Sequence, residues 1–160
     1  MKYKCENELN TLSFKDFEIV SIKAANDKLT INTNGGIARY DNSCNEMLEE
    51  RYISEAEITF FDAKILKFYK EGGKYYDAND KLIEEYPDVE YSPLEYDSLL
   101  KEFSKEDTEA IIFFLSASKT DARPYYELSI DVVNDTYWLN IDASKVTVSF
   151  DRFMNKVIPS

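Results

Sequence analysis

The residues best suited to chemistry in this 160-residue chain are tyrosines that alternate with carboxylates in one short stretch. Residues 84–91 read Glu-Glu-Tyr-Pro-Asp-Val-Glu-Tyr, and further acids follow up to residue 109. Tyrosine offers a large contact area at little rotamer cost, and carboxylates steer and pair with lysine and arginine. This combination therefore favours binding to a basic protein surface.

The excess negative charge is confined to two segments. The chain has 31 acids and 19 bases, a formal net charge of -12. Residues 46–57 hold five acids and one base, and residues 84–109 hold ten acids and two bases, so the remainder is neutral. An alternative interpretation is a solvated acidic face that keeps the protein soluble. From the second segment we select the partner-binding candidates Glu84, Glu85, Tyr86, Asp88, Glu90, Tyr91, Glu95, Asp97 and Glu102.

Motifs for catalysis and metal binding are weak. The chain has no histidine, which removes the usual general base near neutral pH and the commonest transition-metal ligand. Two isolated cysteines, Cys5 and Cys44, cannot form a zinc site and are interpreted as free thiols. Segment 77–88 begins like a calcium loop, but Lys81 and Leu82 stand where an oxygen ligand and glycine are required. We therefore expect no catalytic residue, no metal site and no cofactor.

Two weaker candidates for small-molecule chemistry remain. Asp16 and Asp62 occupy matching places in two similar segments and are the carboxylate pair to inspect for glycoside hydrolysis. Each is interpreted more simply as an acid at a strand edge. Trp138, the single tryptophan, is predicted to pack in the core rather than to form a ligand platform.

The elements that position these residues are predicted to be mostly β-strands, because apolar and polar residues alternate with a period of two. The four glycines form two pairs, Gly35-Gly36 and Gly72-Gly73, where we predict turns with positive φ. The dipeptides Asn26-Asp27 and Asn134-Asp135 predict tight hairpin turns. Strands are predicted over residues 17–24, 29–33, 37–40, 58–61, 64–69, 74–77, 81–86, 125–133, 137–142 and 145–153.

One helix is well signalled after residue 91. Ser92 can cap it, Pro93 suits its first position, and Glu95 completes a Ser-x-x-Glu capping box. An apolar stripe from Tyr96 predicts that the helix ends near Phe103. Residues 110–117 favour a strand buried on both faces, with a second helix as the alternative.

These elements predict a single domain over residues 1–160 of the mainly β (α+β) class. We expect an antiparallel, hairpin-rich sheet, forming a sandwich or a partly open barrel, with one or two helices packed on one face or end. The N-terminus carries no apolar leader, and no run of 18 apolar residues occurs, so we expect a cytoplasmic protein.

In general type the chain resembles the small, acidic, cytoplasmic immunity proteins that bacteria make against secreted toxins. The resemblance rests on the Tyr-rich acidic stretch 84–91, the lack of histidine, and the hairpin-rich pattern that ends with residues 145–151. The resemblance is one of overall composition and strand pattern along the whole chain. It includes no family motif, so it assigns no functional residue. It implies binding and occlusion of a basic toxin's active surface, often that of a nuclease, without catalysis by the inhibitor.

The leading hypothesis is therefore a non-catalytic inhibitor that binds a basic protein, with its oligomeric state left open. The alternatives are a DNA mimic that inhibits a nucleic-acid-binding defence protein, and a β-barrel small-ligand module or carboxylate-dependent enzyme. Carboxylates arrayed at phosphate-like spacing would favour mimicry, whereas a compact patch with central aromatic residues would favour toxin occlusion. Nucleic acid and membranes are not expected as direct partners, because a surface of this sign repels phosphates.

Overall fold

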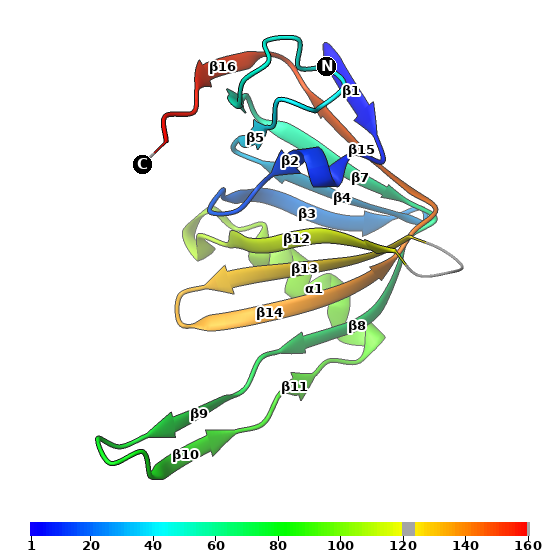
Figure 1. Cartoon of the computed structure of the whole chain (residues 1–160). Helices are drawn as coiled ribbons and strands as arrows, with labels where there is room; N and C mark the ends of the chain where they lie inside the picture. The colour runs from blue at the N-terminus through cyan, green and yellow to red at the C-terminus, as the bar shows by residue number, and fades with distance from the viewer. Residues whose placement is uncertain (120–123, 160) are drawn as a thin grey trace.

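Two five-stranded antiparallel sheets form the body of the protein (Figure 1). The computed structural model describes residues 1–119 and 124–159. The first sheet has the order β1 (Tyr3–Glu6), β15 (Lys145–Phe150), β7 (Ala56–Phe61), β4 (Lys28–Thr33) and β3 (Ile19–Ala25). The second sheet has the order β11 (Val89–Glu90), β8 (Lys64–Lys70), β14 (Asp135–Asp142), β13 (Pro124–Val132) and β12 (Ile111–Lys119).

Smaller elements complete the molecule. A hairpin, here called the arm, projects from the body and consists of β9 (Gly73–Tyr76) and β10 (Leu82–Tyr86) (Figure 1). A four-stranded sheet has the order β16 (Phe153–Lys156), β6 (Arg51–Ile53), β5 (Gly36–Ala38) and β2 (Leu12–Ser13). The helical segments are α1 (Pro93–Phe103) and two 3₁₀ segments, η1 (Leu9–Thr11) and η2 (Glu106–Thr108).

Backbone hydrogen bonds and a shared core join the two main sheets. The Ile112 amide donates to the Phe17 carbonyl at 2.9 Å, next to the edge where β3 meets β12. The inner faces meet in the core, where the rings of Phe60 and Tyr126 lie 5.0 Å apart. Mainly β, antiparallel structure is confirmed, and the described strands do not close into a barrel.

The helix α1 forms where the capping signals predict it. The Ser92 amide donates to the Glu95 carboxylate at 2.8 Å, and the helix ends at Phe103. The Phe103 ring is buried 6.0 Å from that of Phe68 in the second sheet. The Ser104 hydroxyl accepts a hydrogen bond from the Ile22 amide of β3 at 3.0 Å. The helix therefore joins both main sheets, and it lies behind the second one in Figure 1.

Two β-bulges change which side chains face the core. Strict alternation predicts Ile19 and Ile22 on opposite faces of β3, yet both are buried, because the register shifts between Ile19 and Ser21. Residues 111–119 form a strand, as the pattern of residues 110–117 favours, but the expectation that both of its faces are buried is wrong. At the bulge in β12, Phe113 and Phe114 are 45% and 41% exposed.

The prediction that the glycines have positive φ is wrong, because none of the four does. Close packing explains them instead. A Cβ on Gly36 would lie 2.7 Å from the Phe14 ring, and a Cβ on Gly72 would lie 2.0 Å from the Tyr86 carbonyl oxygen. Asn26 and Asp27 do adopt positive φ in the β3–β4 turn, as the Asn-Asp signal predicts.

The second hairpin turn is displaced by one residue from its prediction. Val132 pairs with Asp135, so Val133 and Asn134 form the turn instead of Asn134 and Asp135. Val133 has a φ of 55° and is exposed. β-Branched residues rarely adopt this conformation, so the turn carries backbone strain.

We expect Val133→Asn to raise the free energy of unfolding by about 1 kcal/mol, because asparagine tolerates positive φ. Urea denaturation measures the change. The control is Val20→Asn, since Val20 is an exposed valine without positive φ. The control should give no gain, and a Val133→Asn variant no more stable than wild type would contradict strain at this turn.

The two cysteines are free thiols, as their positions in the sequence predict. Burial raises the pKa of the Cys5 thiol to about 11, against a smaller lowering by the hydrogen bond that the Asn42 amide donates to its sulfur. Because the folded state holds this proton more tightly than the unfolded state, the neutral thiol contributes stability below the unfolded pKa of about 9. That contribution is lost as the pH rises toward 11.

We therefore expect Cys5→Ala to flatten the fall in stability between pH 9 and 11. Cys44 is a free thiol that is only half-buried, so Cys44→Ala serves as the matched control. The free energy of unfolding, measured by urea denaturation across this range, checks the difference in slope. Parallel curves for the two variants would contradict the assignment.

Candidate protein-binding surface

The arm is a bent continuation of the β8–β11 pair. Lys70 pairs with Val89 at the end of the second sheet, and Gly73 pairs with Tyr86 at the start of the arm. Between these pairs, the Gly72 amide donates to the Asp88 carboxylate at 2.7 Å. The backbone at Gly72 leaves no room for a Cβ, so glycine is required where the arm leaves the body.

Apolar side chains on the arm are exposed to solvent. Every residue of β10 is exposed, and the two tyrosines of β9 are more than half exposed. Exposed apolar side chains gathered on one projecting element are typical of a protein-binding site. A lone two-stranded hairpin is also only marginally stable in water. The large exposed side chains on the arm are Tyr75, Tyr76, Leu82, Ile83 and Tyr86.

The strand register divides these side chains between two faces. One face carries Tyr75 and Tyr86, whose rings lie 5.8 Å apart, together with Glu84. The Tyr86 hydroxyl donates to the Glu84 carboxylate at 2.9 Å, and this hydrogen bond raises the pKa of Tyr86. The opposite face carries Tyr76 and the Lys74–Glu85 ion pair at 3.6 Å. Both faces therefore combine aromatic rings with carboxylates.

The structure brings together only part of the predicted contact surface. Glu84, Glu85 and Tyr86 lie on the arm, Asp88 lies at its base, and Glu90 follows in β11. Three other predicted acids are exposed on α1, which lies against the body, and these are Glu95, Asp97 and Glu102.

Tyr91 serves the core as well as the surface. Its ring packs 5.7 Å from that of Phe68 and 6.4 Å from that of Tyr137, and the side chain is half-buried. Glu95 likewise has a structural role, since its carboxylate closes the capping box of α1. Both residues therefore have structural roles in the body, Tyr91 in the packing of the second sheet and Glu95 in the cap of α1.

Most of the predicted carboxylates form no ion pair with a described lysine or arginine. Of the seven acids, only Glu85 and Glu102 form ion pairs within the described part of the chain, with Lys74 and Lys105. Both pairs are exposed, and surface pairs of this kind contribute about 0–1 kcal/mol. Residues 70–90, which span the arm and its base, carry seven acids and three bases, so the charge around the arm is negative.

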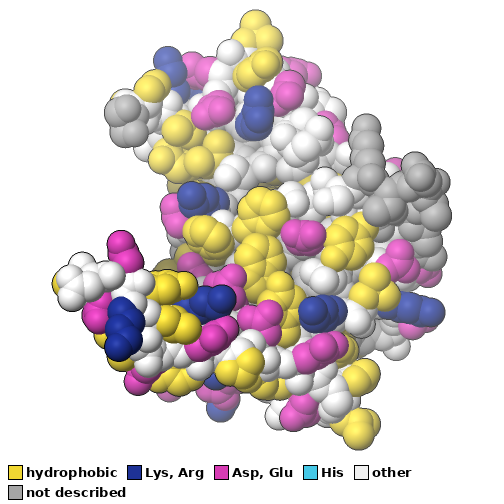
Figure 2. Space-filling view, turned by 60° about the horizontal axis from the view of Figure 1, so that its bottom comes forward, with side chains coloured by type: hydrophobic (Ala, Val, Ile, Leu, Met, Phe, Trp, Pro, Cys, Tyr) yellow, Lys and Arg dark blue, Asp and Glu magenta, His cyan; other side chains and the backbone are white. Residues whose placement is uncertain are grey.

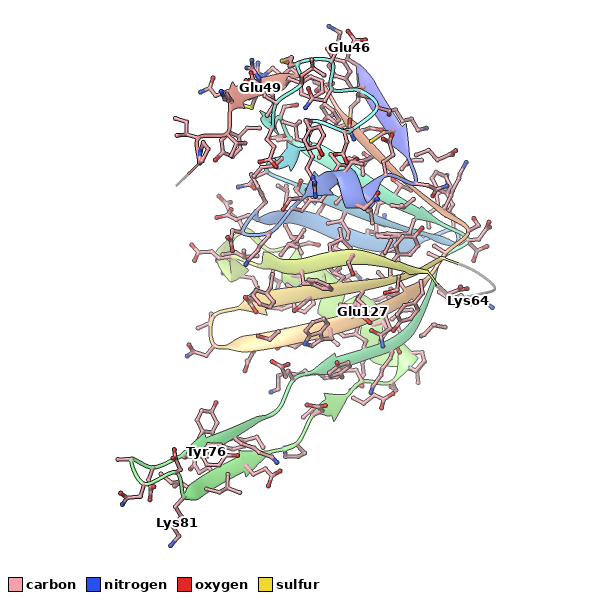
Figure 3. All side chains as sticks on the ribbon, viewed as in Figure 1. Glu46, Glu49, Lys64, Tyr76, Lys81 and Glu127 are labelled. Carbon is pink, nitrogen blue, oxygen red and sulfur yellow. The ribbon has the colours of Figure 1, made fainter. Side chains whose placement is uncertain are left out.

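The other acidic segment, residues 46–57, lies at the opposite end of the molecule. Figure 3 labels Glu46 and Glu49 there, far from Tyr76 and Lys81 at the tip of the arm. Glu49 forms ion pairs with Arg51 and Lys156. The two acidic segments therefore form separate surfaces, and only one of them includes the arm.

Sequence reasoning missed the aromatic residues on the outer face of the second sheet. The register aligns Phe114, Trp138 and Tyr69 across β12, β14 and β8, on the face away from α1. Trp138, predicted for the core, is half-buried on this face with its ring 6.0 Å from that of Phe114. Figure 2 shows hydrophobic side chains in a band across the body beside the arm. The bulge in β12 hides this pattern in the sequence.

The carboxylates considered for catalysis lie in turns. Asp16 and Asp62 have φ of 71° and 49°, and Asp62 accepts a hydrogen bond from the Ser144 hydroxyl at 2.7 Å. Positive φ is compatible with aspartate in tight turns, which accounts for both residues. In residues 1–119 and 124–159, no group of three or more acids and cysteines is placed to hold a metal ion.

Comparisons with known proteins give no relative. No protein-family model, curated protein or solved structure matches this chain. Within the described residues, no helix has both the length and the apolar character needed to cross a membrane.

The packing at Gly72 predicts that Gly72→Ala displaces the arm and leaves the body folded. We expect loss of the nuclear Overhauser contact between the Tyr75 and Tyr86 rings, with little change in the thermal midpoint of the body. Gly36→Ala is the contrasting control, because its Cβ would press on Phe14 and Ile53 and destabilise the core by about 1–3 kcal/mol. An unchanged ring contact in Gly72→Ala would contradict this role for Gly72.

Proposed function

We propose that this protein is a non-catalytic, protein-binding inhibitor that neutralises a basic bacterial toxin, as immunity proteins do. The observation that carries the proposal is the arm, a projecting hairpin that exposes three tyrosines, a leucine and an isoleucine among carboxylates. Within the described part of the chain, Glu85 is the one acid of the arm that forms an ion pair. A partner that covers the arm would bury this apolar surface, and burial of tyrosine dominates many protein interfaces.

Charge supports a basic partner. The net charge of -12 would attract a positively charged protein over a distance, and such steering raises association rates to about 10⁸–10⁹ M⁻¹s⁻¹ at low salt. Carboxylates around aromatic residues would then pair with lysine and arginine at the contact.

The shape of the arm supports occlusion. A hairpin that stands away from the body can enter a concave site, and nuclease sites are concave and basic because they hold phosphates. A DNA mimic would instead need carboxylates arrayed at phosphate spacing, whereas the arm places aromatic side chains between its acids. The arm therefore favours toxin occlusion over mimicry.

The test is affinity capture on the immobilised full-length protein from the source cells and their neighbours, at low salt. We expect a basic protein whose affinity falls by about thirtyfold or more for the variant Tyr76→Ala, Leu82→Ala. Tyr40→Ala, Tyr52→Ala is the matched control, since these two tyrosines are exposed on other parts of the body. Equal loss in both variants, or none in the arm variant, would argue against the arm as the contact.

Salt dependence and inhibition complete the test. We expect the affinity to fall as the salt concentration rises, because ions screen the attraction between exposed charges. Co-expression with the captured protein should protect cells from it, and the arm variant should protect less. An affinity that rises with the salt concentration, or a captured protein that is not inhibited, would contradict the proposal.

A further inference from the structure

The arm has one edge without a strand partner. The pairing between β8 and β14 ends where the Glu71 amide donates to the Thr136 carbonyl at 2.8 Å. Beyond this bond the chain continues as β9, which has β10 on one side and, among residues 1–119 and 124–159, no strand on the other. The free edge of β9 therefore begins where β14 stops, and its unpaired backbone groups are available to another strand.

A groove of about 460 Å³ lies along the start of this edge. One side consists of Glu71 and the arm, with the rings of Tyr75 and Tyr86, and the other side is the β13–β14 turn with Asn134 and Asp135. Figure 1 shows this turn close to the place where the arm leaves the body. The groove is therefore bounded by backbone, two phenol rings and carboxylates.

The charges of the groove select a cationic occupant. Glu71 and Asp135 line it, and Glu84 lies beside Tyr75 and Tyr86 on the same face of the arm, whereas Lys70 is the one cation among the described lining residues. Aromatic rings next to carboxylates bind guanidinium and ammonium groups by cation–π contact and ion pairing. A second copy of this chain would bring its own negative charge to the groove, so self-association is disfavoured.

We propose that the groove receives an extended, lysine- or arginine-bearing segment of the arm's partner, and that this segment pairs with the free edge of β9 as an added strand. The inference rests on the proposed function and specifies how the partner binds. Backbone hydrogen bonds to β9 provide affinity, and alternate side chains of the added strand reach the tyrosines and carboxylates.

A synthetic peptide tests the pairing without the natural partner. The probe is acetyl-Val-Arg-Thr-Arg-Val-Arg-Thr-amide, and two analogues of equal charge carry N-methyl groups on one or the other set of alternate amides. We expect the probe to slow amide hydrogen exchange in residues 73–76 by about tenfold and one methylated analogue to bind about tenfold more weakly. No binding by the probe at millimolar concentration, or equal binding by all three peptides, would overturn the proposal.

Substitutions in the protein test the site. Glu71→Gln and Asp135→Asn should each weaken probe binding about two- to fivefold, as expected for exposed ion pairs. Glu106→Gln removes the same charge from η2, outside the groove, and should change binding less. Equal effects of the three substitutions would mean that the probe responds only to net charge. That result would contradict binding in the groove.

The two proposals fail in different ways. If the captured basic protein depends on the arm but leaves exchange in residues 73–76 unchanged, the inhibitor proposal stands and the added strand is wrong. If the probe pairs with β9 but no basic protein is captured and inhibited, the edge site stands and the proposed inhibitor function is wrong.

Discussion

The exposure of the arm depends on the unequal lengths of neighbouring strands in the second sheet. The chain of β8 and β11 extends beyond the end of β14, whose last backbone bond in that direction joins Thr136 to Glu71. Among the described elements, no sheet or helix covers the side chains beyond this point, and every residue of β10 is exposed. The exposure of the arm therefore results from topology, and residues of strongly apolar type remain at its surface.

Within the described part of the chain, the acidic side chains around the arm form fewer ion pairs with basic residues than those at the opposite end of the molecule. Outside the two acidic segments the chain holds equal numbers of acids and bases, and Glu46 and Glu49 of the first segment lie at the end of the molecule opposite the arm. In the segment at the far end, Glu49 is compensated by Arg51 and Lys156. Around the arm, compensation is limited to exposed pairs. A basic protein approaching the molecule therefore meets unpaired charge and unburied tyrosine at the same place.

Much of the architecture could be predicted because its signals are local. The capping box of α1 and the Asn26-Asp27 turn each depend on a few adjacent residues, and both form as predicted. The bulges in β3 and β12 could not be predicted, because the shift of one residue depends on the partner strand. The role of Gly72 could not be predicted from local sequence either. Gly72 is required by the Tyr86 carbonyl, which is distant in sequence and adjacent only in the folded hairpin.

The sequence predicts only part of the candidate binding surface, because the rest depends on contacts between distant strands. Composition identified the acidic stretch that contains Glu84 and Tyr86, but alternation cannot tell a strand within a sheet from a strand that projects beyond it. Tyr75 and Tyr76 precede the acidic stretch and contribute no charge. They are exposed because β14 ends before the arm begins, a feature that no local pattern encodes. The exposed arm, the open edge of β9 and the acidic groove thus have one structural origin, the end of β14 at Thr136.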